Sequence, residues 1–386
     1  MNLSILEILF WVGLSISVYV YLAYPLLLFY QSKSPKNRKT VNCRGYSFSI
    51  TLFIPAYNEE SVISDKIDNA LSLKYPTDLL EVAIASDGST DRTNEILEEH
   101  RSNPRVKIFY NETNEGKNAL INKFVPLTDG QIIVFTDANS IFSEESLLTI
   151  VRHFSDSTVG CVGGKLTYLS GQSAVAKGEG LYFKYENVIR SFEGKQGKMV
   201  GANGAIYAIR RELFEAVPAH VPNDFFHPLV VLKKGYQTVF EEKAIAFEKA
   251  TESHEEEFKR RSRIVERSVS AIVEVNRRYG VFSGRAWFNI FSHKILRWLT
   301  FPILVSIWVL NLFLLNNPLY MTLFICQTIF YILGTVGYFF QKTGIKIKVF
   351  FVPYYFLLIN LAAFVGMLQW LRGNRIVSWK TASTTR

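Results

Sequence analysis

The stretch QIIVFTDANS, residues 131–140, joins an uninterrupted apolar run to a short acidic turn. Residues 132–135 are β-branched or aromatic, which is typical of a strand buried on both faces in a parallel sheet. Asp137 follows the end of this strand, where open α/β sheets bind their ligands. Together with Asn139 it offers the oxygen ligands that a hard cation such as Mg²⁺ or Mn²⁺ prefers. A turn with a helix cap would explain the same residues, so other parts of the chain must distinguish the two interpretations.

Repeated strand and helix units precede this stretch. Helices with one apolar face follow strands predicted at residues 48–55, 81–85 and 105–110. The order predicts an α/β fold with a doubly wound, mostly parallel sheet. Asp87 follows the second strand and should therefore lie at the same sheet edge as Asp137. Lys117 begins the third helix at this edge, where it would either reach a phosphate or remain a solvated lysine.

Two common glycine signatures of nucleotide sites are missing from the sequence. The first predicted strand is not followed by G-x-G-x-x-G, and the chain has no Walker A sequence. These absences argue against a dinucleotide enzyme and against a P-loop phosphotransferase.

The alternation of strands and helices is less regular after residue 151. Residues 159–169 predict a strand, and residues 180–193 predict a helix whose apolar stripe suits either the core or a membrane interface. Residues 199–209 contain Gly201 and Gly204, which allow close approach of the backbone. This segment would form either the wall of a ligand pocket or a packed strand.

An acidic residue lies among aromatic ones in VPNDFFHP, residues 221–228. Burial beside Phe225 and Phe226 would raise the pKa of Asp224, so that its carboxylate could accept a proton near neutral pH. The simpler interpretation is that Asp224 caps a helix over residues 225–234. His227 is expected to pack or to support the site rather than to bind a metal.

A long helix is predicted over residues 252–278, starting at a capping box of Ser253 with Glu256. Arg260, Arg263 and Arg267 are spaced to lie on one face of this helix. Such a row of guanidinium groups suits a diphosphate leaving group. Alternatively, this is a surface helix in which Glu256 and Glu266 form ion pairs with the arginines.

Apolar segments at both ends predict membrane contact in this chain of 386 residues. Residues 8–30 carry no charge, are long enough to cross a bilayer and lack a cleavage site, which favours an anchor over a signal peptide. The positive-inside rule places the start of the chain outside and the following domain in the cytoplasm, because the run is followed by Lys33, Lys36, Arg38 and Lys39. The net charge of the chain is +9. Much of the excess positive charge lies beside apolar segments, which indicates attraction to anionic lipid rather than binding of nucleic acid.

The C-terminal part is expected to return to the membrane. An interfacial helix at residues 277–294 precedes three candidate spans at residues 295–315, 319–340 and 349–371. A cytoplasmic loop between the last two is marked by Lys342, Lys346 and Lys348. If all three segments cross, the basic tail at residues 373–386 lies outside against the charge rule, which would make one of them re-entrant or interfacial. Reduced thiols are expected at Cys43, Cys161 and Cys326.

Seven short motifs occur in one order between residues 48 and 270: PAYNEE, SDGSTD, NEGKNAL, FTDANS, GANGAIYAIRR, VPNDFFHP and RRSRI. In this order they resemble the family 2 glycosyltransferases, the membrane-bound group that includes cellulose, chitin and hyaluronan synthases. The resemblance implies a GT-A catalytic domain at residues 45–276, between an anchor at residues 1–32 and membrane segments at residues 295–372.

The resemblance also implies the roles of individual residues. Asp224 would be the catalytic base, Arg263 and Arg260 would stabilise the departing diphosphate, and Asp137 and Asn139 would bind Mg²⁺ or Mn²⁺. Asp87 would hold the base of the nucleotide sugar, and the full set expected to bind the donor is Pro55, Tyr57, Glu59, Asp87, Lys117, Asp137, Ala202 and Asn203.

Four positions depart from the family pattern. Asn139 replaces the second acid of the metal motif, Asn223 replaces a glutamate before the base, Arg260 replaces a glutamine and Ile264 replaces a tryptophan. The last change argues against synthesis of long polymers, because that tryptophan seats the acceptor end in processive members.

The resemblance implies a multi-pass enzyme of the plasma or inner membrane, with its catalytic domain in the cytoplasm. It would transfer a sugar from a nucleotide sugar to a hydroxyl of a glycan or lipid-linked acceptor, with inversion of the anomeric configuration. A UDP-sugar is the expected donor, and cell-surface polysaccharide synthesis is the expected process. Two alternatives remain open: a polyprenyl-phosphate sugar synthase, and a non-catalytic membrane scaffold that handles polysaccharide.

Overall fold

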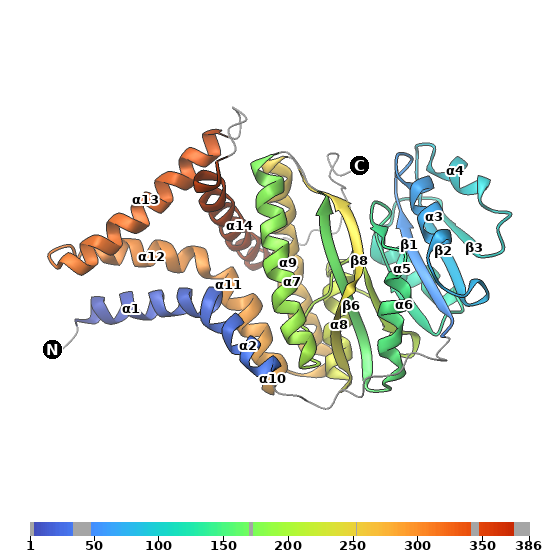
Figure 1. Ribbon diagram of the computed structural model, residues 1–386, viewed down its shortest axis with the longest axis horizontal. Coiled ribbons are helices and arrows are strands. Elements are labelled where there is room, and N and C mark those ends of the chain that lie inside the picture. The colour runs from blue at the N-terminus through green and yellow to red at the C-terminus, as the bar shows by residue number, and fades with distance from the viewer. Residues whose placement is uncertain (1–3, 34–47, 170–172, 252, 341–346, 374–386) are drawn as a thin grey trace.

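The computed structural model describes residues 4–33, 48–169, 173–251, 253–340 and 347–373. They form a mixed α/β part, on the right in Figure 1, and an arm of apolar helices that extends away from it. Two long helices, α7 (Ala174–Lys195) and α9 (His254–Tyr279), stand between the sheet and this arm (Figure 1).

One mixed sheet organises the α/β part, with strands in the order β3-β2-β1-β4-β7-β6-β8-β5. Its strands are β1 (Ile50–Ala56), β2 (Leu80–Asp87), β3 (Val106–Asn111), β4 (Ile132–Phe135), β5 (Ile141–Phe142), β6 (Val159–Leu169), β7 (Tyr207–Arg210) and β8 (Gln237–Lys249). The half from β3 to β4 is parallel throughout, as predicted. In the other half β6 pairs with β8 in parallel, whereas β7 and β5 are antiparallel to their neighbours.

Shorter helices connect these strands and complete the α/β part. They are α3 (Ile63–Ser72), α4 (Thr93–Glu99), α5 (Lys117–Phe124), α6 (Ser146–Val151) and α8 (Asn223–Lys233). The alternation of strands and helices up to β4 confirms the predicted doubly wound arrangement. In the segment at residues 199–209, for which the sequence left a pocket wall and a packed strand open, only β7 is a strand, and residues 199–206 form a loop whose first residue is hydrogen-bonded to Thr238 of β8.

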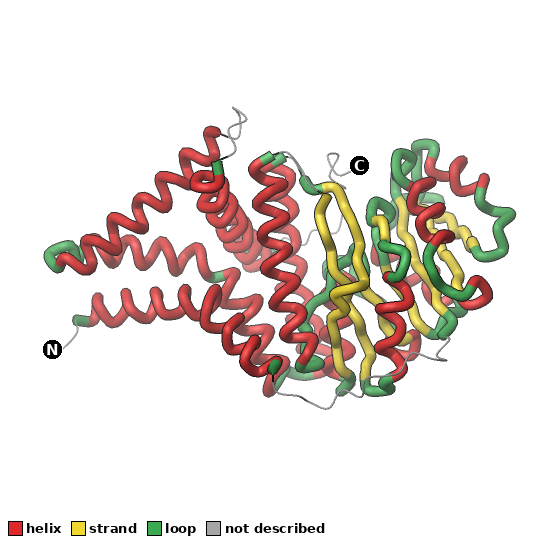
Figure 2. Tube along the Cα trace, in the orientation of Figure 1, coloured by secondary structure: helices red, strands yellow, loops and turns green. Residues whose placement is uncertain are grey.

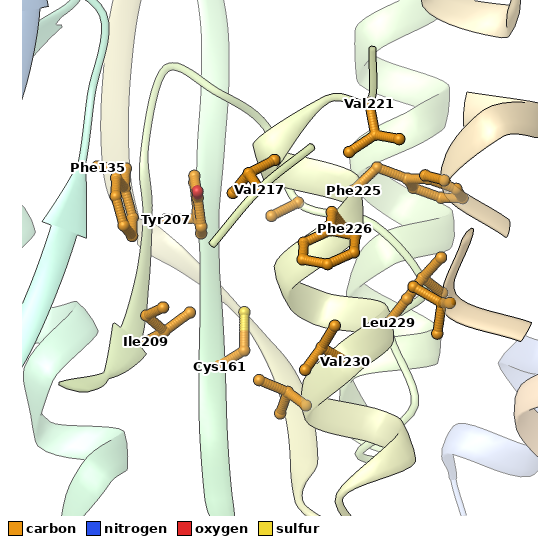
Figure 3. Packing of buried hydrophobic residues seen from close by; sticks show 14 of the residues in the cluster. Phe135, Cys161, Tyr207, Ile209, Val217, Val221, Phe225, Phe226, Leu229 and Val230 are labelled. Carbon is orange, nitrogen blue, oxygen red and sulfur yellow. The ribbon is translucent and has the colours of Figure 1, made fainter. Parts of the chain in front are cut away.

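The apolar run that identified β4 is buried on both faces, as its residue types predicted. On one face, Phe135 stacks on Tyr207 of β7 with ring centroids 4.8 Å apart. Figure 3 shows these two rings beside Cys161 and facing Phe226 on α8. Burial of each such side chain stabilises the fold by roughly 1.5–3 kcal/mol. This packing fixes α8 against the sheet and therefore fixes the position of its first residues.

The arm contains three helices long and apolar enough to cross a membrane: residues 5–32, Pro318–Phe340 (α13) and Lys348–Leu371 (α14). The first is continuous through α1 (Ile5–Val18), a π-helical turn and α2 (Tyr24–Ser32). A further segment is broken: residues 284–298, which contain α10 (Gly284–Asn289) and α11 (Leu296–Trp298), meet α12 (Thr300–Leu312) at 57°. Figure 2 shows the arm as helices only, without strands.

The break changes the expected C-terminal organisation. Residues 277–279 still belong to α9 instead of starting an interfacial helix, and the candidate span at residues 295–315 contains the bend, which fits the expectation that one of the three C-terminal segments does not simply cross. Membrane sidedness stays a prediction, because several residues on which it rests lie outside the described residues: Lys36, Arg38, Lys39, Lys342, Lys346 and the tail from 374 onward. Cys43 also lies outside them, whereas Cys161 is buried and Cys326 is exposed on α13.

Candidate active site

A polar cavity of about 240 Å³ lies between the end of β4, the loop before α5, the start of α8 and one face of α9. Six of the predicted site residues line it: Lys117, Asp137, Asn203, Asp224, Arg260 and Arg263. The lining draws on residues far apart in the sequence, so the fold brings half of the predicted site residues to one place. This cavity is called the polar cavity below.

Gly204 marks the point where three functional groups converge. A methyl group added there would lie 3.2 Å from Asp137 Oδ2, 3.6 Å from Lys117 Nζ and 3.8 Å from Asp224 Oδ2. Only a glycine leaves this space open, because any Cβ would occupy the volume between the three groups. The loop over residues 199–206 therefore lines the cavity, which is one of the two roles that the sequence left open.

Asp87 positions Lys117 by holding the backbone of the two residues before it. Its buried carboxylate accepts hydrogen bonds from the backbone N–H groups of Glu115, at 3.0 Å, and Gly116, at 2.7 Å. Gly116 has a φ of 95°, a conformation that favours glycine, and it precedes the first residue of α5. Lys117 then forms an ion pair with Asp137. Asp87 thus acts on the cavity through the loop that it holds.

The motif PAYNEE, residues 55–60, begins at the end of β1 and is joined by hydrogen bonds to the turn after β2. Pro55 is part of β1, and Asn58 adopts a φ of 52° while its side chain accepts a hydrogen bond from the backbone of Thr90 at 2.8 Å. The backbone N–H of Glu59 donates to the hydroxyl of Thr93 at 2.8 Å. Of the predicted donor and metal residues, those that do not line the polar cavity in the described structure are Pro55, Tyr57, Glu59, Asp87, Asn139 and Ala202.

Asp224 occupies the first turn of α8, and its side chain is half-buried. Burial raises the pKa of Asp224, and the negative charge of Asp137 adds to this effect, whereas the positive charges of Lys117 and Arg190 oppose it. Phe225 lines a neighbouring cavity together with Asp224, but Phe226 points into the core, as Figure 3 shows. The predicted desolvation is therefore present, although Phe226 contributes to the core instead.

His227 packs below Asp224, as expected for a supporting residue. Its ring is buried and is hydrogen-bonded through Nδ1 to the Tyr207 hydroxyl at 2.9 Å, which in turn accepts a hydrogen bond from Asn223 at 2.6 Å. The hydrogen bond from Asn223 to Tyr207 thus holds the start of α8 against β7. This contact gives a structural role to one position at which the sequence departs from the family pattern.

The arginine row on α9 faces the polar cavity with all three members, Arg260, Arg263 and Arg267. Arg260 forms ion pairs with Glu257 and with Glu179 of α7, so the pair with Glu256 that a surface helix would form is not the one observed. Burial lowers the pKa of Arg263 to about 10, and the positive charges of Arg267 and Arg260 lower it further in the same direction. An anion in the cavity would relieve this repulsion.

Glu248, at the end of β8, lines the polar cavity but was not predicted as a site residue. Burial, together with the charge of Asp137, raises the pKa of Glu248 to about 7. A signal for it exists in the sequence, because Ala244, Ala246 and Glu248 alternate along β8 and all three are buried. A glutamate on the buried face of a strand needs a partner, and here it accepts a hydrogen bond from Ser140.

Lys66 was also missed, although it supports the turn that carries Asp137. It is fully buried on α3 and donates to the hydroxyl of Thr136 at 3.0 Å and to the backbone carbonyl of Ser140. Burial lowers the pKa of Lys66 to about 7. Its position beside the apolar stripe of α3 is the signal that would have identified it as a buried lysine.

The residues around Asp137 can accommodate a divalent cation only in part. Asp137 exposes about a third of its side chain (33%) at the cavity and supplies one hard carboxylate. Asn139 is half-buried, and within the described part of the chain no three His, Cys, Asp or Glu side chains are grouped to hold a metal. Phosphate oxygens of a bound donor would have to supply further ligands.

A second cavity of about 170 Å³ adjoins the polar cavity at Asp224 and extends toward the apolar arm. The two share five lining residues: Phe183, Asn203, Pro222, Asp224 and Ile264. Its remaining walls come from α7, α9, residues 201–202, Phe225 of α8, residues 293–298 and α14, with Tyr21 of the N-terminal helix. It is called the arm cavity below.

Comparisons with known proteins identify the family of part of this chain. The family model described as Glycosyl transferase family 2 matches residues 51–217. A beta-monoglucosyldiacylglycerol synthase from Nostoc sp. is 34% identical over 116 residues, which are 29% of this chain and 25% of that relative. A poly-beta-1,6-N-acetyl-D-glucosamine synthase from Staphylococcus epidermidis is 26% identical over 161 residues, 42% of this chain and 38% of that relative. The chain thus spans well under half the length of these curated relatives.

Among solved structures, the fold is similar to that of the mannosyltransferase PcManGT from Pyrobaculum calidifontis, in complex with GDP-Man and Mn²⁺. The TM-score is 0.69 with 19% sequence identity, over 94% of this chain and 99% of that chain. At this identity the likeness establishes the fold, a GT-A-like α/β domain with apolar helices at both ends. The matched motifs and this fold together identify residues 51–217 of the chain as a family 2 glycosyltransferase domain.

Proposed function

We propose that this chain is a membrane-embedded, inverting glycosyltransferase that moves a sugar from a nucleotide-sugar donor to a hydroxyl of a glycan or lipid-linked acceptor. The observation that carries the proposal is the convergence at Gly204 of Asp137, Lys117 and Asp224, within 3.2–3.8 Å of one point. A carboxylate for a metal, a cation for phosphate and a desolvated base are the three groups that such a transfer needs.

The donor's diphosphate would lie in the polar cavity, between Lys117 and the arginines of α9. Burial and, after it, the positive charges of Arg267 and Arg260 lower the pKa of Arg263, and this supports the placement because a bound anion would offset both effects. As the bond from the anomeric carbon to the diphosphate breaks, Arg263 and Lys117 would stabilise the charge that develops on the leaving oxygen. A UDP-sugar is the donor we expect, with Asp87, Tyr57 and Asn203 among the residues that shape its site.

Asp137 would hold Mg²⁺ or Mn²⁺, with Asn139 as a weaker ligand. The bound ion would supply positive charge to the donor's diphosphate. The ion pair between Lys117 and Asp137 has to open for this carboxylate to bind a cation, so metal and donor should enter together.

Asp224 would take the proton of the acceptor hydroxyl while the hydroxyl oxygen bonds to the anomeric carbon from the face opposite the diphosphate. Its position on the border of both cavities supports this role, and so does its raised pKa. A single displacement of this kind inverts the anomeric configuration. The helical arm supports a multi-pass location in the plasma or inner membrane, with the catalytic domain in the cytoplasm.

The test is a donor screen on the full chain in detergent or lipid nanodiscs. Release of nucleoside diphosphate is measured for a set of nucleotide sugars with and without Mn²⁺, together with the anomeric configuration of the product. We expect release from one class of donor, dependent on the metal, and an inverted product. No release from any donor with any glycan or lipid acceptor would favour the non-catalytic scaffold.

A further inference from the structure

Arg190 on α7 is a buried cation with unused hydrogen-bonding capacity. Its side chain lines the arm cavity and is only 8% exposed. Among the described residues, its Nε and Nη1 atoms have no hydrogen-bond partner. Among the described residues its ion-pair partner is Glu186, 3.6 Å from Nη2, while Asp224 interacts with it at longer range. Leaving buried donors of a charged group unpaired is costly, so these atoms indicate a ligand that the cavity is built to receive.

The cations around this cavity outnumber the carboxylates that contact them. Lys294 and Arg297 each lie 2.8 Å from Glu186, which they share with Arg190. Burial alone would raise the pKa of Glu186, but the positive charges of Lys294, His293 and Arg297 hold this pKa well below its usual range. Glu186 is therefore ionised, and its single charge faces three cations. The surplus positive charge favours an anion in the cavity.

The walls of the arm cavity connect this charge to the membrane. Trp298, Ile359 and Ala363 contribute apolar surface from helices that are candidate membrane segments or that join them. At the other end, Asp224 borders the polar cavity. A molecule that fills the arm cavity would thus have an anionic group at Arg190, an apolar part toward the arm and a third part at Asp224.

We propose that the arm cavity binds the phosphate group of a lipid-embedded acceptor, with Arg190, Lys294 and Arg297 as its ligands. The inference rests on the proposed function and names the class of acceptor for that same site: a lipid phosphate that carries the acceptor hydroxyl. The phosphate anchors the molecule, and the hydroxyl reaches Asp224. Neutral lipids and free glycans lack the group that Arg190 requires.

The experiment measures binding to the full chain in detergent by calorimetry, with farnesyl phosphate as the probe. Inorganic phosphate and farnesol are the comparison probes, because each carries only one of the two recognised features. We expect farnesyl phosphate to bind most tightly, and Arg190→Gln to weaken it by about tenfold to a hundredfold, as loss of a charged hydrogen bond predicts. Arg190→Lys should retain part of the affinity. Lys184→Gln, which removes an exposed charge from the same helix, should leave it unchanged.

Three results would overturn the inference. They are equal affinity for farnesol and farnesyl phosphate, equal affinity for inorganic phosphate and farnesyl phosphate, and unchanged binding of farnesyl phosphate to Arg190→Gln. A thermal melt of each variant identifies loss of folding, and Arg190→Lys then serves as the deciding variant. Binding that depends on Arg190 in a chain that turns over no nucleotide sugar would contradict the proposed function alone. Turnover without such binding would contradict this inference alone.

Discussion

The polar cavity and the arm cavity meet at Asp224, yet they are built in different ways. The polar cavity is lined by loops and strand ends of the α/β part together with α7 and α9, and its arginines on α9 stand at regular spacing along one helix face. The arm cavity shares α7, α8 and α9 with it but adds residues from the broken segment at residues 284–298, from α14 and from the N-terminal helix. The first suits a soluble, highly charged ligand, and the second suits a molecule that is partly apolar. The difference supports the proposal that a soluble donor and a lipid acceptor approach Asp224 from opposite sides.

The largest effect is expected at the border between the cavities. Asp224→Asn keeps the shape of the residue but removes the base, so turnover should fall by about 10²- to 10⁴-fold, the usual contribution of general base catalysis. Steady-state release of nucleoside diphosphate in the presence of acceptor measures it. Asp68→Asn, an exposed change on α3, is the matched control.

A loss of less than about tenfold for Asp224→Asn would change the assignment of the acceptor, because a phosphate oxygen that attacks directly needs little help from a base. The phosphate at Arg190 would then be the nucleophile, as in a polyprenyl-phosphate sugar synthase. The border residue thus distinguishes a phosphate that anchors the acceptor from one that reacts.

The next effect should be confined to the polar cavity. Lys117→Met removes the cation paired with Asp137, and nucleoside diphosphate should bind about tenfold to a hundredfold more weakly, as loss of a charged hydrogen bond predicts. Calorimetric titration with Mn²⁺ present measures the affinity. Lys195→Met, which removes an exposed lysine outside the cavity, should have little effect. Equal loss in both variants would mean that the effect reflects overall charge and not the Lys117 site.

A smaller effect is expected at the metal ligands, where the polar cavity is short of carboxylates. Mn²⁺ should bind weakly without donor and much more tightly with nucleoside diphosphate, and the coupling must be reciprocal. Asn139→Asp adds one negative charge and should tighten donor-free Mn²⁺ binding by about tenfold. Asp137→Ala should weaken Mn²⁺ binding both with and without nucleoside diphosphate while the fold remains intact. Tight donor-free binding that Asp137→Ala does not change would contradict the metal site.

The smallest effect concerns communication between the two cavities through charge. The pKa of Asp224 is raised above its ordinary value, and turnover needs the ionised form, so the rate should fall as pH drops through this raised pKa. Arg190 lowers the pKa of Asp224, so Arg190→Gln should move this acid limb to higher pH. The pH dependence of kcat measures the shift, and Lys184→Gln is the control. A limb that stays in place or moves to lower pH would mean that Arg190 does not act on the base.

The contrast between the cavities also explains what could be predicted from the sequence. Strands β1 to β4 and the positions of Asp87 and Asp137 follow from local patterns, because a buried apolar run and the polar turn after it are adjacent in the chain. Asp224 and the arginine row were found because each lies in a short recognisable segment. In the polar cavity, Glu248 was not predicted, although the alternation of buried residues along β8 gives a signal for it.

The arm cavity could not be predicted in the same way. Arg190 lies on a helix whose apolar stripe gave no reason to single it out, and its neighbours Lys294 and Arg297 are about a hundred positions away in the chain. Whether these charges meet depends on how α7 packs against the broken segment, which is a matter of tertiary structure. Hydropathy alone also does not predict the bend of 57° between residues 284–298 and α12.

The most direct test of two ligands meeting at one base is to measure both affinities in the same two variants. Nucleoside diphosphate with Mn²⁺ and farnesyl phosphate are each titrated into the full chain carrying Lys117→Met or Arg190→Gln. The account predicts that Lys117→Met weakens only the nucleotide and that Arg190→Gln weakens only the lipid phosphate. If either variant weakens both ligands equally, or if Arg190→Gln weakens the nucleotide alone, the two cavities do not serve two substrates and the account is wrong.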